Sequence, residues 1–284
     1  MRSFLTNKIK KKLSYKNKND NLFQTYSSYN LASKEGNTYV SKDLIRVIAA
    51  KGFNFKKTME DNLEVNLNGL NYSKAIRTLI AIACSTNGES LSILDFGGGT
   101  GHHYFIAKKL LTEDIKVNWL IVETPELVNE IKKYDIENEE LKFFTSLSEA
   151  TQYCDNFDVV YANVSLCYTE NPNLDLKNLL KLNYKKVFIT NHPLSKNKEH
   201  DIIGLQISDL KTNGVGREIP IELNIKNKEI KYPFTIQQEQ EFESIVKKYC
   251  SIVSKFKEVD EAYKTQDGNF NTYGYILSKK LNND

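Results

Sequence analysis

The sequence predicts an α/β fold: a mostly parallel sheet of seven strands with helices on both faces and an antiparallel last strand. From residue 91 onward, short apolar strand patterns alternate with helical patterns, which is the rhythm that parallel βαβ units produce. The first of these strands ends in an acid, and four glycines follow within five residues. Glycines at such a point allow a sharp turn from a strand into a helix.

Residues 1–40 precede these units and are predicted to form a loosely ordered polar arm. They are rich in Lys, Asn, Ser and Tyr and show little periodicity. Leu5, Ile9 and Leu13 recur every four residues among the lysines, so a short basic amphipathic helix stays open as an alternative. In either case we expect the arm to lie outside the apolar core.

The formal charge of the chain is +3, and much of its basic character comes from this arm. Residues 1–18 hold seven Lys and Arg and no acid, which leaves 32 bases against 36 acids in residues 19–284. A mildly acidic body argues against a broad nucleic-acid-binding face, so DNA is excluded as a partner and RNA is not favoured. The arm leaves a peripheral contact with a membrane surface open.

Residues 41–88 are predicted to form a helical cap over the sheet. Ser41 stands where a helix N-cap is expected, and Gly52 is predicted to end the helix that Ser41 begins. A second helix is predicted over residues 72–84, because apolar residues recur there at helical spacing.

Residues 89–284 are predicted as a single domain. The expected strands span residues 91–96, 117–123, 141–144, 157–162, 186–190, 252–256 and 273–278. The expected helices span residues 103–111, 126–133, 147–154, 174–182 and 237–249. Residues 193–235 interrupt the alternation with a polar stretch, in which 219–225 is a short extended piece. This stretch is too long for an ordinary connection and is predicted to be a substrate-facing insertion.

The four cysteines, at positions 84, 154, 167 and 250, have no spacing typical of a metal site or a disulfide framework. No apolar run approaches the ~20 residues of a membrane-spanning helix. The basic start of the chain is not followed by the apolar core of a secretory signal. These features predict a cytoplasmic protein with reduced thiols.

The glycine-rich turn is the most informative stretch. It follows the first predicted strand and contains Asp95, Gly97, Gly98, Gly99 and Gly101. A dinucleotide fingerprint requires a glycine where His102 stands, and a phosphate-binding loop of the Walker type requires a lysine that this stretch lacks. The remaining pattern is acid-x-G-x-G-x-G. Its acid would repel a pyrophosphate but can accept hydrogen bonds from the ammonium group of a ligand.

The second predicted strand also ends in an acid, Glu123. A carboxylate at this place can accept both hydroxyl groups of a ribose. Thr124 and Pro125 follow as an N-cap and a first-turn proline, so a helix begins at once. Together with the glycine-rich turn, Glu123 favours a ligand with a free ribose.

These two motifs resemble those of class I S-adenosylmethionine-dependent methyltransferases, and the resemblance covers about residues 90–192. It implies a Rossmann-like fold and S-adenosylmethionine as the cofactor. More narrowly, the Asp-Phe-Gly-Gly-Gly start followed by Tyr104-Phe105 resembles a little-studied group of bacterial methyltransferases associated with surface-polysaccharide synthesis.

The resemblance also implies a role for each matched residue. Asp95 and the glycines at positions 97–101 would hold the methionine end of the cofactor and approach its ribose. Glu123 would bind the ribose hydroxyls, and Thr124 would lie under the adenine. Ser146 and Leu147 would lie at the adenine edge, and Asn163 would lie beneath the methyl donor.

The residues after the fourth predicted strand bear on the acceptor. The stretch from Asn163 to Leu166 departs from the [DN]-P-P-[YF] motif, which disfavours methylation of nucleic-acid bases. A hydroxyl acceptor requires a base, and the candidates are His192, which follows the fifth predicted strand, and Tyr168. No metal is predicted, because no acid follows the fourth strand before Glu170.

The sequence therefore predicts a methyltransferase that acts on a small-molecule or carbohydrate-like acceptor, on oxygen. Two alternatives stay open. One is an RNA methyltransferase that uses the basic arm, and the other is a non-catalytic protein that binds S-adenosylmethionine and a partner.

Overall fold

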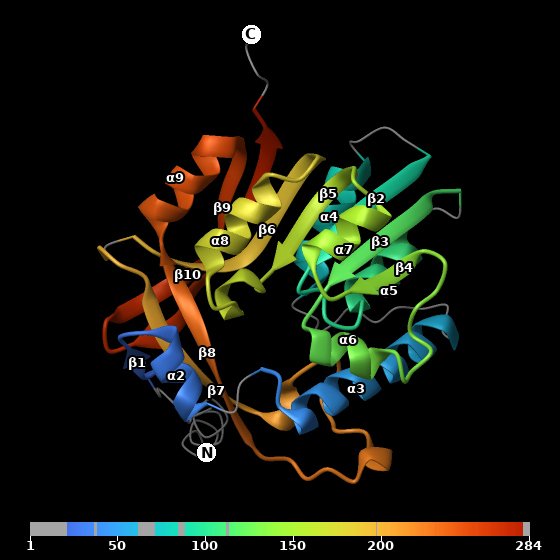
Figure 1. Ribbon diagram of the computed structural model, residues 1–284, viewed down its shortest axis with the longest axis horizontal. Helices are drawn as coiled ribbons and strands as arrows, with labels where there is room; N and C mark the ends of the chain where they lie inside the picture. Colours follow the sequence, from blue (N-terminus) through green and yellow to red (C-terminus); the bar gives the residue numbers. More distant parts are fainter. Residues whose placement is uncertain are drawn as a thin grey trace, which may run out of the picture.

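A mixed sheet is the centre of the molecule. The structure, a computed structural model, describes residues 22–36, 39–61, 72–84, 89–111, 114–196 and 198–280. Within these residues, seven strands match the predicted ones: β2 (Ser90–Phe96), β3 (Lys116–Val122), β4 (Leu141–Phe144), β5 (Phe157–Asn163), β6 (Tyr184–Ser195), β9 (Cys250–Thr265) and β10 (Gly268–Lys279). Figure 1 shows them fanning across the molecule.

The seven strands lie in the order β4-β3-β2-β5-β6-β10-β9. Strands β2 to β6 are parallel along this order, and β10 is antiparallel to both of its neighbours. The predicted α/β, Rossmann-like fold is therefore confirmed. The sheet is more mixed than expected, because further antiparallel strands extend it beyond β6.

The extension comes from the predicted insertion and the N-terminal segment. Strands β7 (Ile202–Asp209) and β8 (Glu229–Gln238) form an antiparallel pair, β1 (Thr25–Tyr26) pairs with β7, and β8 joins the end of β6. The extended piece predicted over 219–225 is wrong, since that stretch holds the short 3-10 helix η3 (Ile221–Leu223). The apolar alternation that marks a buried strand instead runs through Ile230, Tyr232, Phe234 and Ile236, all of which are buried.

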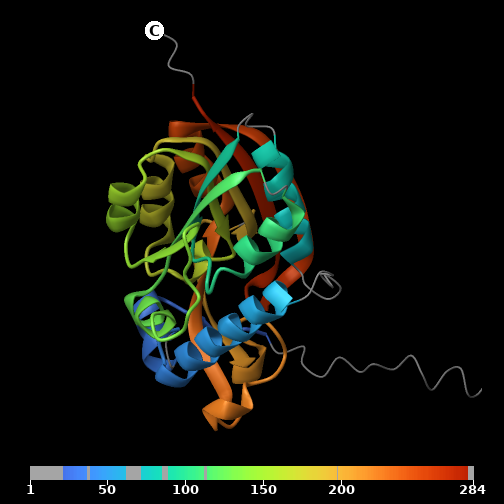
Figure 2. The same ribbon diagram turned by 90° about the vertical axis from the view of Figure 1, so that its right-hand side faces the viewer.

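Helices cover the two faces of the sheet. Strand residues alternate between the faces, so Ile93 packs with α3 (Lys42–Asp61), α4 (Tyr72–Cys84), α5 (His102–Leu110) and α6 (Pro125–Ile131). Leu94 packs on the opposite face with α7 (Leu147–Tyr153), α8 (Pro172–Leu180) and α9 (Glu239–Tyr249). The two layers are separate in Figures 1 and 2. No helix in the described ranges is long and apolar enough to cross a membrane.

The predicted helical cap is confirmed only in part. Gly52 does not end the first helix, because α3 continues to Asp61. A Cβ atom at Gly52 would lie 2.2 Å from Oγ1 of Thr100, so the glycine allows close packing of α3 on the glycine-rich turn. Helix α4 begins and ends as predicted, and it covers the sheet by lying against α5 and β5.

The predicted arm also differs from the structure. Residues 1–21, with the basic tail and the amphipathic alternative, lie outside the described residues. Beyond them, β1 and α2 (Tyr29–Glu35) are ordered elements docked on β7 and β8. Ser28 begins α2 as its N-cap by accepting a hydrogen bond from the backbone N–H of Leu31 at 3.3 Å.

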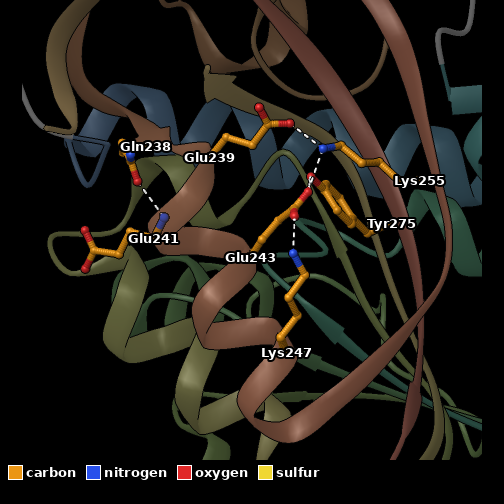
Figure 3. Close-up of polar contacts among 7 residues, drawn as sticks. All are labelled: Gln238, Glu239, Glu241, Glu243, Lys247, Lys255 and Tyr275. Atoms are coloured by element: carbon orange, nitrogen blue, oxygen red, sulfur yellow. Dashed lines mark hydrogen bonds and ion pairs between the residues drawn. The ribbon is translucent and has the colours of Figure 1, made fainter. Parts of the chain in front are cut away.

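An ionic network attaches α9 to the neighbouring strands (Figure 3). Lys255 of β9 donates to Glu243 at 2.6 Å and also to Glu239. Glu243 accepts further hydrogen bonds from Lys247 at 2.8 Å and from the hydroxyl of Tyr275 at 3.2 Å. Partial burial raises the pKa of Glu243, but the two lysines outweigh it and bring that pKa down to about 2.

This depressed pKa predicts an acid-dependent contribution to stability. The ionic network should stabilise the fold fully above the ordinary pKa of 4.5, and this gain should disappear as the pH falls toward about 2. Glu243→Gln should therefore lower the free energy of unfolding by about 0.5–1 kcal/mol at pH 7, a value discounted for solvent screening, and by much less near pH 2.5. Urea unfolding at the two pH values measures this. Glu241→Gln is the control on the same helix, and equal pH dependence in both variants would contradict the prediction.

Candidate functional site

A cavity of about 570 Å³ opens at the carboxyl ends of the parallel strands. Its walls come from the loops that follow β2, β3, β4 and β5, with further residues from α8. Strands β2 and β5 are neighbours in the sheet, with β3 next to β2 and β6 next to β5. The connection after β2 therefore leads to one side of this pair, and the connection after β5 leads to the other side. Ligands in open α/β sheets bind at such a reversal point. We refer to this space as the larger cavity.

The glycine-rich turn begins at the wall of the larger cavity, which Gly97 lines. Gly97, Gly99 and Gly101 have φ values of +70°, +62° and +81°, in the left-handed region that favours glycine. A Cβ atom at Gly97 would lie 2.3 Å from Cβ of Ser165, so the first glycine is also required by close packing. The turn is therefore specified by both backbone conformation and space.

Glu123 connects this turn to the end of β3. Its carboxylate accepts a hydrogen bond from the N–H of Gly99 at 2.9 Å and another from the N–H of Thr124 at 3.0 Å. Burial raises the pKa of Glu123, and these two hydrogen bonds act against it. The side chain lines the larger cavity and keeps lone pairs for a ligand.

Six of the ten predicted cofactor-binding residues line the larger cavity, and Asp95, Gly98, Gly99 and Gly101 do not. The six are Gly97, Glu123, Thr124, Ser146, Leu147 and Asn163. Thr124 and Ser146 also begin α6 and α7 as N-caps, which positions them beside the strand ends. Asn163 accepts a hydrogen bond from the side chain of Asn191 at 2.8 Å, and its Nδ2 lies 3.2 Å from Nε2 of His103. The structure thus brings these residues together at one edge of the sheet.

Asp95 is part of the turn but not of the cavity wall. It is 1% exposed, and its carboxylate accepts a hydrogen bond from Nε1 of Trp119 at 3.1 Å. Burial raises the pKa of Asp95 to about 7, although the Trp119 hydrogen bond and His102 oppose this shift. A Cβ atom at Gly98 would lie 2.5 Å from Cγ of Asp95. Direct contact of Asp95 with a ligand is not supported, since the carboxylate is enclosed beneath the turn.

His192, a predicted base, does not line the larger cavity. Its ring stacks on Phe242 of α9, with ring centroids 4.9 Å apart, and burial lowers its pKa to about 4 against an opposing effect of Gln237. Val187 and Ile189 of β6 face the α9 side, so regular alternation would place Asn191 there as well. Asn191 has a φ of +53° and breaks the alternation. It therefore lines a second, smaller cavity of about 250 Å³, whereas His192 packs beneath α9. The sequence thus located His192 correctly at the end of the fifth predicted strand, but its side chain lies on the face that packs against α9 and not at the larger cavity.

Tyr168, the other predicted base, does line the larger cavity. Its hydroxyl donates to Oε1 of Gln206 at 2.8 Å. Burial raises the pKa of Tyr168 well above its ordinary value of 10.0, and neighbouring Tyr263 adds to the shift. The hydroxyl therefore stays protonated at neutral pH and suits a donor better than a base.

Several residues of the cavity wall were not predicted, among them Asp175, Asn178 and Tyr39, which do not follow a strand. Asp175 comes from the first turn of α8, where acids are common for helix stability alone, so its sequence position carried no distinct signal. Burial raises its pKa, and a hydrogen bond with Thr169 opposes the shift. Tyr39 stacks on Tyr168 with centroids 5.9 Å apart, and it comes from a segment that was predicted to be part of the arm.

No protein-family model and no curated protein sequence matches this chain. Solved structures align with it at low identity. The S-adenosylmethionine-dependent methyltransferase from Clostridium acetobutylicum ATCC 824 aligns at 12% identity and a TM-score of 0.48, over 80% of this chain and 100% of that chain. Magnesium protoporphyrin IX methyltransferase from Synechocystis PCC 6803, with bound SAM, aligns at 11% identity and a TM-score of 0.48, over 90% and 100%.

A third structure, the N-methyltransferase NodS from Bradyrhizobium japonicum WM9 in complex with S-adenosyl-L-homocysteine, aligns at 10% identity and a TM-score of 0.44. The alignment covers 80% of this chain and 100% of that chain. The α/β fold of the present chain is established by its own strand order.

Proposed function

We propose that this chain binds S-adenosylmethionine in the larger cavity and transfers a methyl group to oxygen of a small-molecule or carbohydrate-like acceptor. The observation that carries the proposal is the junction of Glu123 with the glycine-rich turn. A carboxylate with spare lone pairs lies there beside a loop whose first glycine, Gly97, lines the cavity without a side chain. A cytoplasmic location and a role in surface-polysaccharide synthesis are part of the same proposal.

The charge of the larger cavity favours a cationic ligand. Two acids, Glu123 and Asp175, line it, and no Lys, Arg or His is among its described lining residues. S-adenosylmethionine carries a sulfonium and an ammonium group, whereas a dinucleotide carries a pyrophosphate that these acids would repel. The cavity therefore suits the sulfonium cofactor better than a phosphate-bearing one.

The lining residues also fit the separate parts of this cofactor. Glu123 would accept hydrogen bonds from the ribose hydroxyls, and Leu147 with Thr124 would contact the adenine. Asp175 would accept a hydrogen bond from the ammonium group. The cofactor supplies an activated methyl group, and the protein orients the acceptor oxygen in line with it, which accounts for much of the rate in such displacements.

Tyr168 would position the acceptor through its protonated hydroxyl, which can accept a hydrogen bond from an acceptor hydroxyl while it donates to Gln206. His192 is not carried forward as the base, because its ring lies under α9. With His192 set aside, water would serve as the base that takes the proton of the acceptor hydroxyl.

Calorimetry with S-adenosylmethionine, S-adenosylhomocysteine and NADH tests the cofactor, and a labelled-methyl transfer assay over fractionated metabolites and glycans tests the acceptor. Tight binding of the two sulfur nucleosides, with transfer to a glycan or small alcohol, supports the proposal. Tighter binding of NADH would overturn it. Binding without transfer to any fraction would favour the non-catalytic alternative, and transfer to RNA that is lost on deletion of residues 1–18 would favour the RNA alternative.

A further inference from the structure

The smaller cavity adjoins the larger one, and Val164 is part of both walls. Val164 follows β5 and has a φ of +55°, a left-handed conformation that is rare for a β-branched residue. Its N–H donates to the carbonyl of Thr190 at 3.0 Å, which holds this conformation. Backbone strain of this kind clusters at functional sites. The two cavities are thus separated at this point by one strained residue.

Two hydrogen bonds also join the walls of the cavities. Tyr168 of the larger cavity donates to Gln206 of the smaller one at 2.8 Å. Asn191 of the smaller cavity donates to Asn163 of the larger one at 2.8 Å. Residues of each cavity wall are therefore held in position by hydrogen bonds from the wall of the other cavity, and a ligand in either cavity would contact such residues.

The smaller cavity is uncharged and partly apolar. Phe23, Val164, Val259 and Ala262 supply its apolar wall, and the polar wall consists of Asn191, Gln206, Tyr263 and Thr272. No Lys, Arg, His, Asp or Glu is among these lining residues. An ionic ligand would lose its hydration there without a compensating partner, so the cavity favours a neutral molecule.

Two polar groups of the wall are available to such a molecule. Thr272 is 4% exposed, and its hydroxyl has no hydrogen-bond partner among the described residues. The side-chain nitrogen of Asn191 is engaged by Asn163, which leaves its carbonyl oxygen as an acceptor. A volume of about 250 Å³ is below the range of about 300–1,000 Å³ for drug-sized ligands. One small hydroxylated ring fits these features better than a nucleoside.

We propose that the smaller cavity receives the methyl acceptor and that the acceptor is an uncharged, hydroxyl-bearing ring the size of one sugar. This inference rests on the function proposed above. The acceptor oxygen would reach past Val164, where the two cavities adjoin, and bond directly to the methyl carbon as the carbon–sulfur bond breaks. The electron pair of that bond returns to sulfur, and the hydroxyl proton passes to water. Thr272 and Asn191 bind the other hydroxyls, while Phe23 and Val259 contact the apolar face of the ring.

A matched pair of variants on β9 tests the proposal. Val259 is 47% exposed and lines the smaller cavity, whereas Val253 is 56% exposed and lines neither cavity. Val259→Trp should fill the cavity, and Val253→Trp adds the same side chain to the same strand outside it. Thr272→Val removes the available hydroxyl with little change of shape.

The probes are the uncharged methyl glycosides of glucose, galactose and mannose, together with the methyl glycoside of glucuronate. Their binding to protein saturated with S-adenosylhomocysteine is measured by ligand-observed NMR, and methyl transfer to them is measured with labelled S-adenosylmethionine. At least one uncharged glycoside should bind and be methylated by the unchanged protein and by Val253→Trp. Val259→Trp and Thr272→Val should each weaken this binding by about tenfold or more, and the glucuronate should bind at least about tenfold more weakly.

Calorimetry with S-adenosylmethionine distinguishes a failure of the proposed function from a failure of the inference about the smaller cavity. S-adenosylmethionine affinity should stay within about twofold in all three variants. Absence of S-adenosylmethionine binding by the unchanged protein would overturn the proposed function and this inference with it. Normal cofactor binding overturns the inference alone if no uncharged glycoside binds, if the glucuronate binds more tightly, or if Val259→Trp binds the glycosides as the unchanged protein does.

Discussion

Glu123→Ala should weaken S-adenosylmethionine binding by about 1.5–3 kcal/mol, which corresponds to roughly a 10- to 150-fold increase in Kd. The substitution removes the acceptor for the ribose hydroxyls. It also leaves the N–H of Gly99 without the carboxylate that holds it at 2.9 Å. Both losses act on the same ligand, because Gly99 belongs to the turn on which the cofactor would lie. Isothermal titration calorimetry measures the effect.

Glu126→Ala is the control for this prediction. Glu126 is an exposed residue in the first turn of α6, three positions after Glu123, and it does not line the larger cavity. Its replacement should change the Kd by about twofold at most, since a surface charge outside the site contributes little. Equal Kd values for the Glu123→Ala variant and the unchanged protein would remove Glu123 from the cofactor site.

Gly97→Ala should destabilise the protein by about 2–5 kcal/mol and abolish cofactor binding. A left-handed backbone costs a non-glycine residue about 1–2 kcal/mol. Overpacking costs about 1–3 kcal/mol more, because the new Cβ would lie 2.3 Å from Cβ of Ser165. In a chain of this size, each kcal/mol should lower the Tm by about 2–4 °C. Thermal unfolding and calorimetry give the two readouts.

Gly216→Ala separates the backbone effect from the packing effect. Gly216 has a φ of +84°, but a Cβ atom there meets no heavy atom within 4 Å. This variant should show only the backbone cost of about 1–2 kcal/mol, with cofactor affinity unchanged. If Gly97→Ala lowers the Tm no more than Gly216→Ala does, the proposed contact with Ser165 is not what requires glycine at position 97.

The strand ends of the site could be predicted from sequence because each one is marked locally. Gly97, Glu123, Ser146 and Asn163 all follow a short apolar strand pattern, and parallel strands bring their carboxyl ends to one edge. For these four residues, the local strand pattern is enough to predict the final position, because the sheet brings the strand ends together. The strand-end part of the larger cavity was therefore within reach of sequence analysis, whereas Tyr39, Asp175 and Asn178 reach the cavity from segments that do not follow a strand.

The corrected predictions depend on contacts between distant segments. Gly52 is typical of a helix end, but it lies inside α3 because Thr100 packs on it at a distance too short for a side chain. Asp95 is typical of a ligand-binding acid, yet Trp119 takes its carboxylate. Neither partner can be recognised from the neighbouring sequence.

By itself, then, the sequence determined the order of strands and helices from β2 to β6, the glycine-rich turn and the acid that binds to it, because these follow from local periodicity and backbone conformation. The tertiary structure alone decided which side chain at the end of β6 faces a cavity, placing Asn191 at the smaller cavity and His192 under α9. It alone also created the smaller cavity, where Phe23, Gln206 and Thr272 meet from distant parts of the chain. The physical reason is that a cavity wall is a product of packing, and the packing partners of a residue are not encoded by its neighbours.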